Sequence, residues 1–268
     1  MPAKKTTVRT ADSAGNIAES PHQQTQVVVT CEHGGNHIPA DYQPLFANAS
    51  KVLSSHRGWD PGALGIARTF ASDLKAPLYF STISRLLVEL NRSTWHKQLF
   101  SEFTVGLSGS ERQLILEKYY RPYRKRVTDF ICSQLDQGNN VVHISMHSFT
   151  PVFDGVCRTT DIGLLYDPRR KTEKDLCREW KRNLRAVFPG WRLHCNQPYR
   201  GAADGLTTQL RKTTEHLSCA AVYCGIEVEV NQRLCSGDRK AHGLQIAKGL
   251  RSALTEAMRL QDWNNEKS

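Results

Sequence analysis

Two short runs of β-branched and apolar residues, far apart in the chain, each lead into a histidine. The first covers residues 26–31 and continues through Glu32 into His33, which two glycines follow. The second covers residues 141–146 and ends at His147. A short apolar run bounded by turn signals is typical of a strand that is buried on both faces of a sheet. We therefore expect a sheet whose buried strands carry histidines at their carboxyl ends.

Amphipathic segments alternate with apolar runs along the rest of the chain. Apolar residues at helical spacing predict helices over residues 62–74, 111–137, 172–187 and 241–260. Further strands are predicted over residues 77–80, 86–90, 162–166 and 221–230. Asp60, just before Pro61, is predicted to cap the first helix. The alternation predicts the α/β class, as a three-layer α/β/α domain with a mixed, mostly parallel central sheet.

The composition is that of a globular protein, with 39% hydrophobic and 23% charged residues. Residues 1–24 contain no apolar run, so we expect a disordered tail there and a single α/β domain over residues 25–262. No window reaches the roughly 18 apolar residues of a membrane span, and the start lacks the apolar stretch of a signal peptide. We expect a cytoplasmic protein that does not contact a membrane.

The formal net charge is +10, which makes nucleic acid a partner to consider. However, the basic residues are scattered among acidic ones. The densest basic groups, at residues 121–126 and 169–171, lie on predicted helices or helix starts, where a solvated face explains them. The excess charge therefore favours a small anionic substrate over nucleic acid, and the sequence leaves the oligomeric state open.

The two strand-end histidines are candidate metal ligands. In open α/β sheets, ligands bind beyond the carboxyl ends of the strands, where His33 and His147 are expected. A catalytic zinc ion needs about three protein ligands and one open position. Four residues could supply the third ligand: Asp60, Glu32, His37 and His56. Spacing alone does not choose among them.

Acidic residues alternate with apolar ones near the end of the last predicted strand. The alternation puts Glu227 and Glu229 on one side of the strand and Ile226, Val228 and Val230 on the other. Two interpretations are open. The acids could decorate a solvated edge strand, or one of them could be a general base, because a shielded carboxylate acquires the raised pKa that proton transfer from water requires.

Several arginines are candidates for binding a carboxylate, since a guanidinium can hold one by two hydrogen bonds. Arg85 precedes the predicted strand at residues 86–90, and the pair Asn91 and Arg92 follows it. Arg200 lies in a probable loop. Each arginine taken alone is equally compatible with a surface position.

Five short strings occur in a fixed order along the chain: CEHGGNHIP at residues 31–39, DPGA at 60–63, SRLLVELNR at 84–92, HS at 147–148 and IEVEVN at 226–231. Together they resemble the N-formylglutamate amidohydrolase family, and they cover most of the chain. The resemblance implies a phosphorylase/hydrolase-like α/β/α fold, similar to zinc carboxypeptidases and aspartoacylases. It also implies a metal-dependent amidohydrolase that acts on linear amides, with N-formyl-L-glutamate or a similar small anionic N-acyl amino acid as substrate.

The resemblance also implies roles for individual residues. His33, Asp60 and His147 match the residues that bind Zn²⁺, and Glu229 matches the general base better than Glu227 does. Asn91 and Arg92 are similar to the Asn-Arg pair with which zinc carboxypeptidases hold a substrate carboxylate. As a hypothesis about the mechanism, we expect Arg85 to stabilise the oxyanion and Arg200 to help hold the carboxylates. The alternatives are a metallopeptidase-like hydrolase of carboxylate-bearing peptides, or a non-catalytic protein that binds acidic metabolites or nucleic acid.

Overall fold

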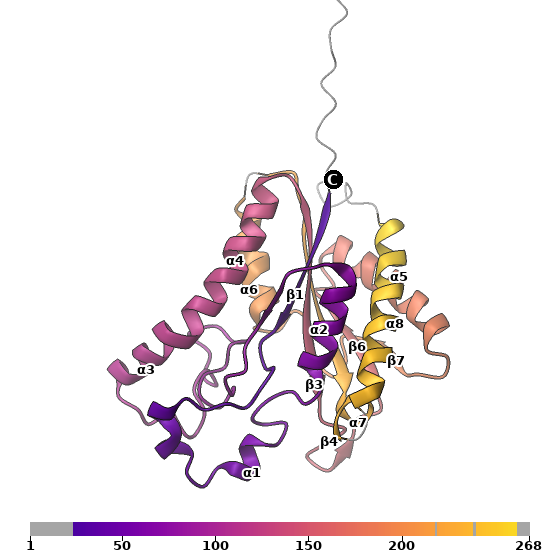
Figure 1. Cartoon of the computed structure of the whole chain (residues 1–268). Helices are drawn as coiled ribbons and strands as arrows, with labels where there is room; N and C mark the ends of the chain where they lie inside the picture. The colour runs from indigo at the N-terminus through magenta and orange to yellow at the C-terminus, as the bar shows by residue number, and fades with distance from the viewer. Residues whose placement is uncertain (1–23, 218, 238–239, 262–268) are drawn as a thin grey trace, which may run out of the picture.

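The computed structural model describes residues 24–217, 219–237 and 240–261. Its centre is a six-stranded sheet of order β2-β1-β3-β8-β6-β7 (Figure 1). The strands are β1 (Thr25–Cys31), β2 (Leu78–Phe80), β3 (Asn140–Phe149), β6 (Ile162–Leu165), β7 (Leu193–Cys195) and β8 (Tyr223–Asn231). Neighbours from β2 to β8 are parallel, β6 is antiparallel to β8, and β7 is parallel to β6. The predicted mixed, mostly parallel sheet is confirmed.

Helices cover both faces of this sheet (Figure 1). The longer ones are α2 (Ala63–Leu74), α3 (Gly109–Ile115), α4 (Arg121–Asp136), α5 (Lys171–Val187), α6 (Leu206–Glu215) and α8 (Lys240–Arg259). Short elements are η1 (Ala40–Phe46), α1 (Ser50–Leu53), η2 (Leu116–Tyr120), α7 (Gln232–Cys235) and the hairpin of β4 (Val152–Phe153) and β5 (Val156–Cys157). Residues of α2, α5 and α8 share one apolar core, and residues of α4 and α6 share a second one. The three-layer α/β/α class is therefore confirmed.

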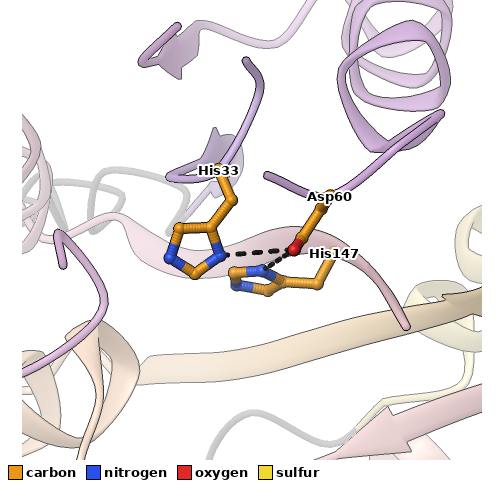
Figure 2. A group of neighbouring side chains, drawn as sticks. All are labelled: His33, Asp60 and His147. Carbon is orange, nitrogen blue, oxygen red and sulfur yellow. Dashed lines mark hydrogen bonds and ion pairs between the residues drawn. The ribbon is translucent and has the colours of Figure 1, made fainter. Parts of the chain in front are cut away.

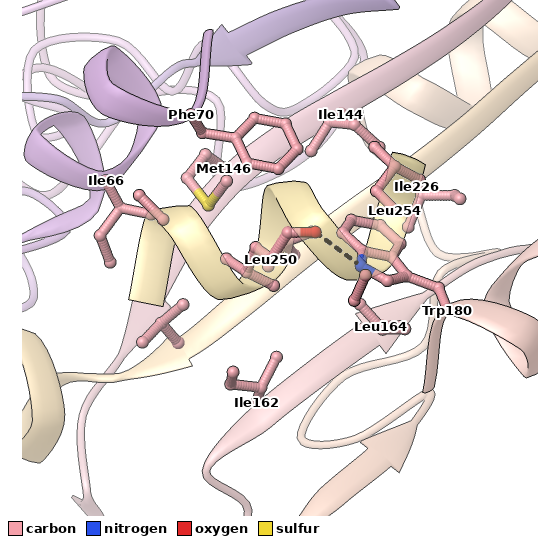
Figure 3. Close-up of a cluster of buried hydrophobic side chains, with 14 of the residues drawn as sticks. Ile66, Phe70, Ile144, Met146, Ile162, Leu164, Trp180, Ile226, Leu250 and Leu254 are labelled. Carbon is pink, nitrogen blue, oxygen red and sulfur yellow. Dashed lines mark hydrogen bonds between the residues drawn. The ribbon is translucent and has the colours of Figure 1, made fainter. Parts of the chain in front are cut away.

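The first core packs against one face of the central strand β3. Val142, Ile144 and Met146 alternate along β3 and contact side chains of α2, α5 and α8 (Figure 3). Trp180 of α5 lies among them, fully buried, and its indole N–H donates a 3.0 Å hydrogen bond to the carbonyl of Leu250. This packing uses every second residue of β3, so its other face is left to residues 141, 143, 145, 147 and 149.

The strand predicted over residues 86–90 is wrong. Leu86, Leu87, Val88 and Leu90 are buried in the second core, but the segment forms turns and pairs with no strand of the described chain. After β2 the chain leaves the sheet as an irregular segment, whose apolar residues share the second core with residues of α4. A short apolar run indicates that a segment is buried, but it does not distinguish a buried strand from a buried loop.

Asp60 does not cap a helix, contrary to the sequence prediction. Helix α2 begins at Ala63, and the residue before it is Gly62, in a left-handed conformation with φ of 87°. A Cβ atom on Gly62 would lie 2.5 Å from the carbonyl oxygen of Cys235, so both the backbone and the packing require glycine there. The Asp60 side chain is consequently available for other contacts.

Other sequence predictions have mixed outcomes. The helix predicted over residues 111–137 is one helical run from Gly109 to Asp136, with the π-helical segment η2 inside it. Strand β7 and helix α6 were not predicted. Among the described helices, none is long and apolar enough to span a bilayer. The predicted disordered tail lies outside the described residues, apart from residue 24.

Candidate metal centre and active site

His33 and His147 come together because the strands that carry them are neighbours. Strands β1 and β3 pair in parallel, with Thr30 opposite Ser145. His33 follows β1 by two residues, and His147 lies in β3, which runs three residues further than the predicted strand. The imidazole centroids are 5.0 Å apart, and each residue is only 2% exposed.

Asp60 joins the two histidines from the loop before α2. Its backbone N–H donates a 2.9 Å hydrogen bond to the carbonyl of His33. Its Oδ2 lies 2.8 Å from Nδ1 of His147 and 3.3 Å from Nδ1 of His33 (Figure 2). One potential ligand atom from each residue lies within 4.8 Å of the others, so the group could hold a metal ion. In the described part of the chain, it is the only such group.

The other candidates for the third ligand lie elsewhere. Glu32 is fully buried but faces Nε2 of His147, at 3.1 Å, and so approaches that ring from the edge opposite Asp60. His37 is exposed, and His56 is half-buried. The structure therefore groups Asp60 with the two histidines.

Glu89, to which the sequence reasoning gave no role, completes the surroundings of His33. Its Oε1 accepts a short hydrogen bond from Nε2 of His33, and its Oε2 lies 2.7 Å from Nε of Arg85. The NH1 group of Arg85 also contacts Oδ1 of Asp60 at 3.2 Å. An acid inside the apolar string LLVEL was the available signal, because a lone carboxylate in such a run needs a buried partner.

The buried acids of this group are charged. Burial acts to raise the pKa of Asp60, but His33, His147 and Arg85 outweigh it and hold that pKa well below its ordinary range. Burial likewise acts to raise the pKa of Glu89, but Arg85 and His33 outweigh this effect and lower that pKa. The same balance raises the pKa of His33 and His147, since their carboxylate neighbours outweigh the effect of burial.

Glu229 is the exception among these acids. It is 6% exposed on β8, directly opposite His147 of β3, and its Oε2 has no hydrogen-bond partner among the described residues. Burial, together with the charges of Asp60 and Glu227, raises its pKa to about 8. Because β8 lies between β3 and β6, the edge-strand interpretation of the two acids is wrong. Glu227 accepts a 2.8 Å hydrogen bond from Thr207.

A cavity of about 340 Å³ opens onto this group. All eight site residues proposed from the sequence line it: His33, Asp60, Arg85, Asn91, Arg92, His147, Arg200 and Glu229. Residues that the sequence reasoning did not select also line it: Ser148, Tyr199, Ala203, Asp204 and Glu227. The cavity is therefore the place to look for substrate binding.

Asn91 and Arg92 contact the loop between β7 and α6 as well as the cavity. Oδ1 of Asn91 accepts a 2.7 Å hydrogen bond from the backbone N–H of Leu206, and Arg92 donates to the carbonyl of Asp204. Arg200, on the same loop, is exposed, and its guanidinium makes no ion pair with an acid of the described residues. The loop thus forms one wall of the cavity, with one unpaired cation on it.

Comparison with known proteins identifies the family. The sequence model of N-formylglutamate amidohydrolase matches residues 25–236. The chain belongs to the N-formylglutamate amidohydrolase family. A crystal structure of a gene product from Agrobacterium tumefaciens is similar, with 27% sequence identity and a TM-score of 0.74 over 88% of this chain and 91% of that chain. A search of curated protein sequences finds no significant match.

A second solved structure carries the family's own description. It is an N-formylglutamate amidohydrolase from Ralstonia eutropha JMP134, with 15% identity and a TM-score of 0.60 over 89% of this chain and 96% of that chain. At this identity the likeness extends to the fold alone. Membership of the amidohydrolase family and the buried His–Asp–His group together indicate a metal-dependent amidohydrolase.

Proposed function

We propose that this protein is a zinc-dependent amidohydrolase that cleaves the N-formyl or another N-acyl amide of a small acidic amino acid, such as N-formyl-L-glutamate. One observation carries the proposal: His33, Asp60 and His147 converge beside the unpartnered carboxylate of Glu229 on a single cavity, in a chain of this family. Water adds to the acyl carbonyl, the C–N bond breaks, and a carboxylic acid and an amine are released.

The residues at the site fit a divalent cation. Two imidazoles and one carboxylate are a ligand set that zinc uses, and a fourth position remains for water or substrate. The buried carboxylates of Glu32, Asp60 and Glu89 with the guanidinium of Arg85 carry a net charge of two minus, which a divalent ion balances when both imidazoles are neutral. Zn²⁺ held by His33, Asp60 and His147 supplies a Lewis acid that polarises a carbonyl oxygen.

Glu229 is the proposed general base. Its Oε2 is buried and has no competing hydrogen-bond donor among the described residues, so it is available to a water molecule in the cavity. It takes a proton from the attacking water and returns the proton to the leaving amine nitrogen. Glu227 suits this role less well because Thr207 already donates to its Oε1.

Arg85 is proposed to stabilise the negative charge that develops on the acyl oxygen. A guanidinium has five N–H donors, and the contacts of Arg85 with Asp60 and Glu89 leave donors free on the cavity side. Its side chain is 28% exposed, so a substrate can reach it.

Asn91, Arg92 and Arg200 are proposed to bind the carboxylates of the amino-acid part. Arg200 is the strongest candidate for a direct ion pair, because no acid of the described chain neutralises it. Asn91 and Arg92 are proposed to bind a carboxylate and also to hold the loop that carries Arg200. Asn91 accepts from Leu206 at the end of this loop, and Arg92 donates to Asp204 within it. These three side chains favour a small anionic substrate.

The proposal is tested by loading the protein with zinc and measuring amine release from N-formyl, N-acetyl and N-succinyl amino acids. We expect about one zinc ion per chain, turnover of an N-acyl acidic amino acid, and loss of turnover in chelator. Faster cleavage of peptides with a free carboxylate would instead identify a metallopeptidase-like enzyme. Binding of these compounds without any amine release would identify a non-catalytic binding protein.

A further inference from the structure

The two histidines of the candidate metal centre have similar surroundings, because a carboxylate oxygen lies next to each of their ring nitrogens. Each directs Nδ1 toward Oδ2 of Asp60, at 3.3 Å for His33 and 2.8 Å for His147 (Figure 2). Each directs Nε2 toward a different buried carboxylate. Glu89 accepts from Nε2 of His33, and Oε2 of Glu32 lies 3.1 Å from Nε2 of His147.

We propose that Glu32 and Glu89 are positioning residues that hold the Nε2–H groups of His147 and His33, so that both imidazoles present Nδ1 to the metal ion. The inference rests on the proposed function, because it concerns how that ion is bound. A carboxylate behind a ligating histidine sets the tautomer and the ring orientation, and makes the other nitrogen a better donor.

The hydrogen bonds around Ser145 determine the tautomer of His147. The hydroxyl of Ser145 donates to Oε2 of Glu32 at 2.7 Å, which uses its only hydrogen. Its oxygen lies 2.9 Å from Nε2 of His147, and this second contact requires Ser145 to be the acceptor. Since Glu32 is also an acceptor, Nε2 of His147 carries a hydrogen, and Nδ1, which faces Oδ2 of Asp60, is the nitrogen that would give up its hydrogen to bind the ion.

Glu32 is fixed in place for this task. It is fully buried, and the hydroxyl of Tyr123 on α4 donates a 2.9 Å hydrogen bond to its other oxygen, Oε1. With Ser145 and His147 on Oε2, both carboxylate oxygens are occupied. Glu32 therefore cannot turn toward the Nδ1 edge of His147 without breaking these contacts.

Glu89 is held just as closely behind His33. Its Oε1 accepts from the backbone N–H of Asn91 at 3.0 Å as well as from His33, and its Oε2 accepts from Arg85 at 2.7 Å. Glu32 is next to His33 in the sequence, in the turn after β1, and yet contacts His147. The two positioning carboxylates thus come from separate segments of the chain.

The test measures how tightly the protein binds a metal ion. The dissociation constant of Zn²⁺ is determined by competition with a chelator for the wild-type protein, Glu32→Gln and Glu89→Gln, and the absorption spectrum of the Co²⁺-loaded proteins reports the ligand field. Glutamine keeps the size and one acceptor oxygen but loses the charge. We expect each variant to bind Zn²⁺ about 10–100-fold more weakly and to alter the cobalt spectrum. Alanine at either position should weaken binding further.

Two further variants separate positioning from general stability. Glu173→Gln is the matched control, because Glu173 is a buried carboxylate, paired with Arg211 at 2.8 Å, that does not line the cavity. It should lower the melting temperature and leave Zn²⁺ affinity unchanged. Tyr123→Phe removes only one hydrogen-bond donor to Glu32, so it tests the positioning role of Glu32 even if Glu32→Gln does not fold. We expect its affinity for Zn²⁺ to fall several-fold.

The outcomes for the two proposals are distinct. A wild-type protein that binds Zn²⁺ and glutamine variants that bind it equally well would overturn the positioning role and leave the proposed function standing. Equal weakening in Glu173→Gln would also overturn it. A wild-type protein that binds neither Zn²⁺ nor Co²⁺ would overturn the proposed function itself.

Discussion

The two faces of strand β3 are both buried, but they differ in chemistry. All of its residues from Asn140 to Phe149 are buried. On one face, Ile144 and Met146 pack into the apolar core of α2, α5 and α8. On the other face, Ser145 and His147 enter a network of hydrogen bonds. Burial therefore has two different roles in one strand, stability on one side and the arrangement of reactive groups on the other.

The polar face is stable because nearly every group on it has a partner. A buried polar group without a hydrogen bond costs free energy of folding. His143 illustrates the rule, with Thr30 at 2.8 Å on Nε2 and the hydroxyl of Tyr223 at 2.7 Å on Nδ1. Oε2 of Glu229, opposite His147 on the neighbouring strand β8, departs from the rule. On an otherwise satisfied face of the sheet, the incompletely satisfied group is the candidate for function.

The largest effect on the site is expected when His147 is removed. His147→Ala should abolish both zinc retention and turnover, since the metal loses one of three ligands and Asp60 loses its closest partner. Zinc content by elemental analysis and amine release measure the effect. Met146→Ala, the adjacent residue on the apolar face, is the matched control and should keep its zinc. A fully active, zinc-replete His147→Ala protein would contradict the division between the faces.

The next largest effect is expected at the unpartnered acid. Glu229→Gln should lower kcat by about 10²–10⁴-fold, because the amide cannot take a proton from water, while zinc content stays at the wild-type level. Steady-state kinetics with elemental analysis test this. Glu227→Gln is the comparison variant from the same strand. If it caused the larger loss of kcat, the general base would be Glu227.

On the apolar face, Ile144→Ala should destabilise the protein without disturbing the site. Ile144 is fully buried, so the substitution leaves a cavity and should lower the free energy of unfolding by about 2–5 kcal/mol. Denaturant-induced unfolding measures the loss, and kinetics at a temperature where the variant is folded should give the wild-type kcat. A stable Ile144→Ala protein with impaired kcat would show that the two faces are not separable.

The smallest effect is expected where the polar face serves stability alone. Tyr223→Phe removes the hydroxyl that contacts Nδ1 of His143 and leaves a buried ring nitrogen unpaired, which should lower the free energy of unfolding by about 1–3 kcal/mol. Zinc affinity should not change, because neither residue contacts the His33, Asp60 and His147 group. Unfolding curves with a parallel zinc titration test both statements, and unchanged stability would mean that the hydroxyl contributes nothing.

Much of the fold could be predicted from local patterns. Apolar runs and helical spacing predicted β1, β3, α2, α5 and α8, because the period of hydrophobic residues reports which side of an element is buried. The run at residues 86–90 failed for the same reason, since it is buried but makes no strand pairing. Helix α6 was missed, although the loop before it, which carries Arg200 and forms one wall of the cavity, was predicted.

The sequence by itself determined that histidines stand at the carboxyl ends of two buried strands, and that Glu227 and Glu229 share one side of a third. These features depend on residues close together in the chain. The tertiary structure alone decided that Asp60, 27 residues from His33 and 87 from His147, joins the histidines, and that Glu89 supports His33 from 56 residues away. Such contacts depend on the path of the loops between elements, which local periodicity does not encode.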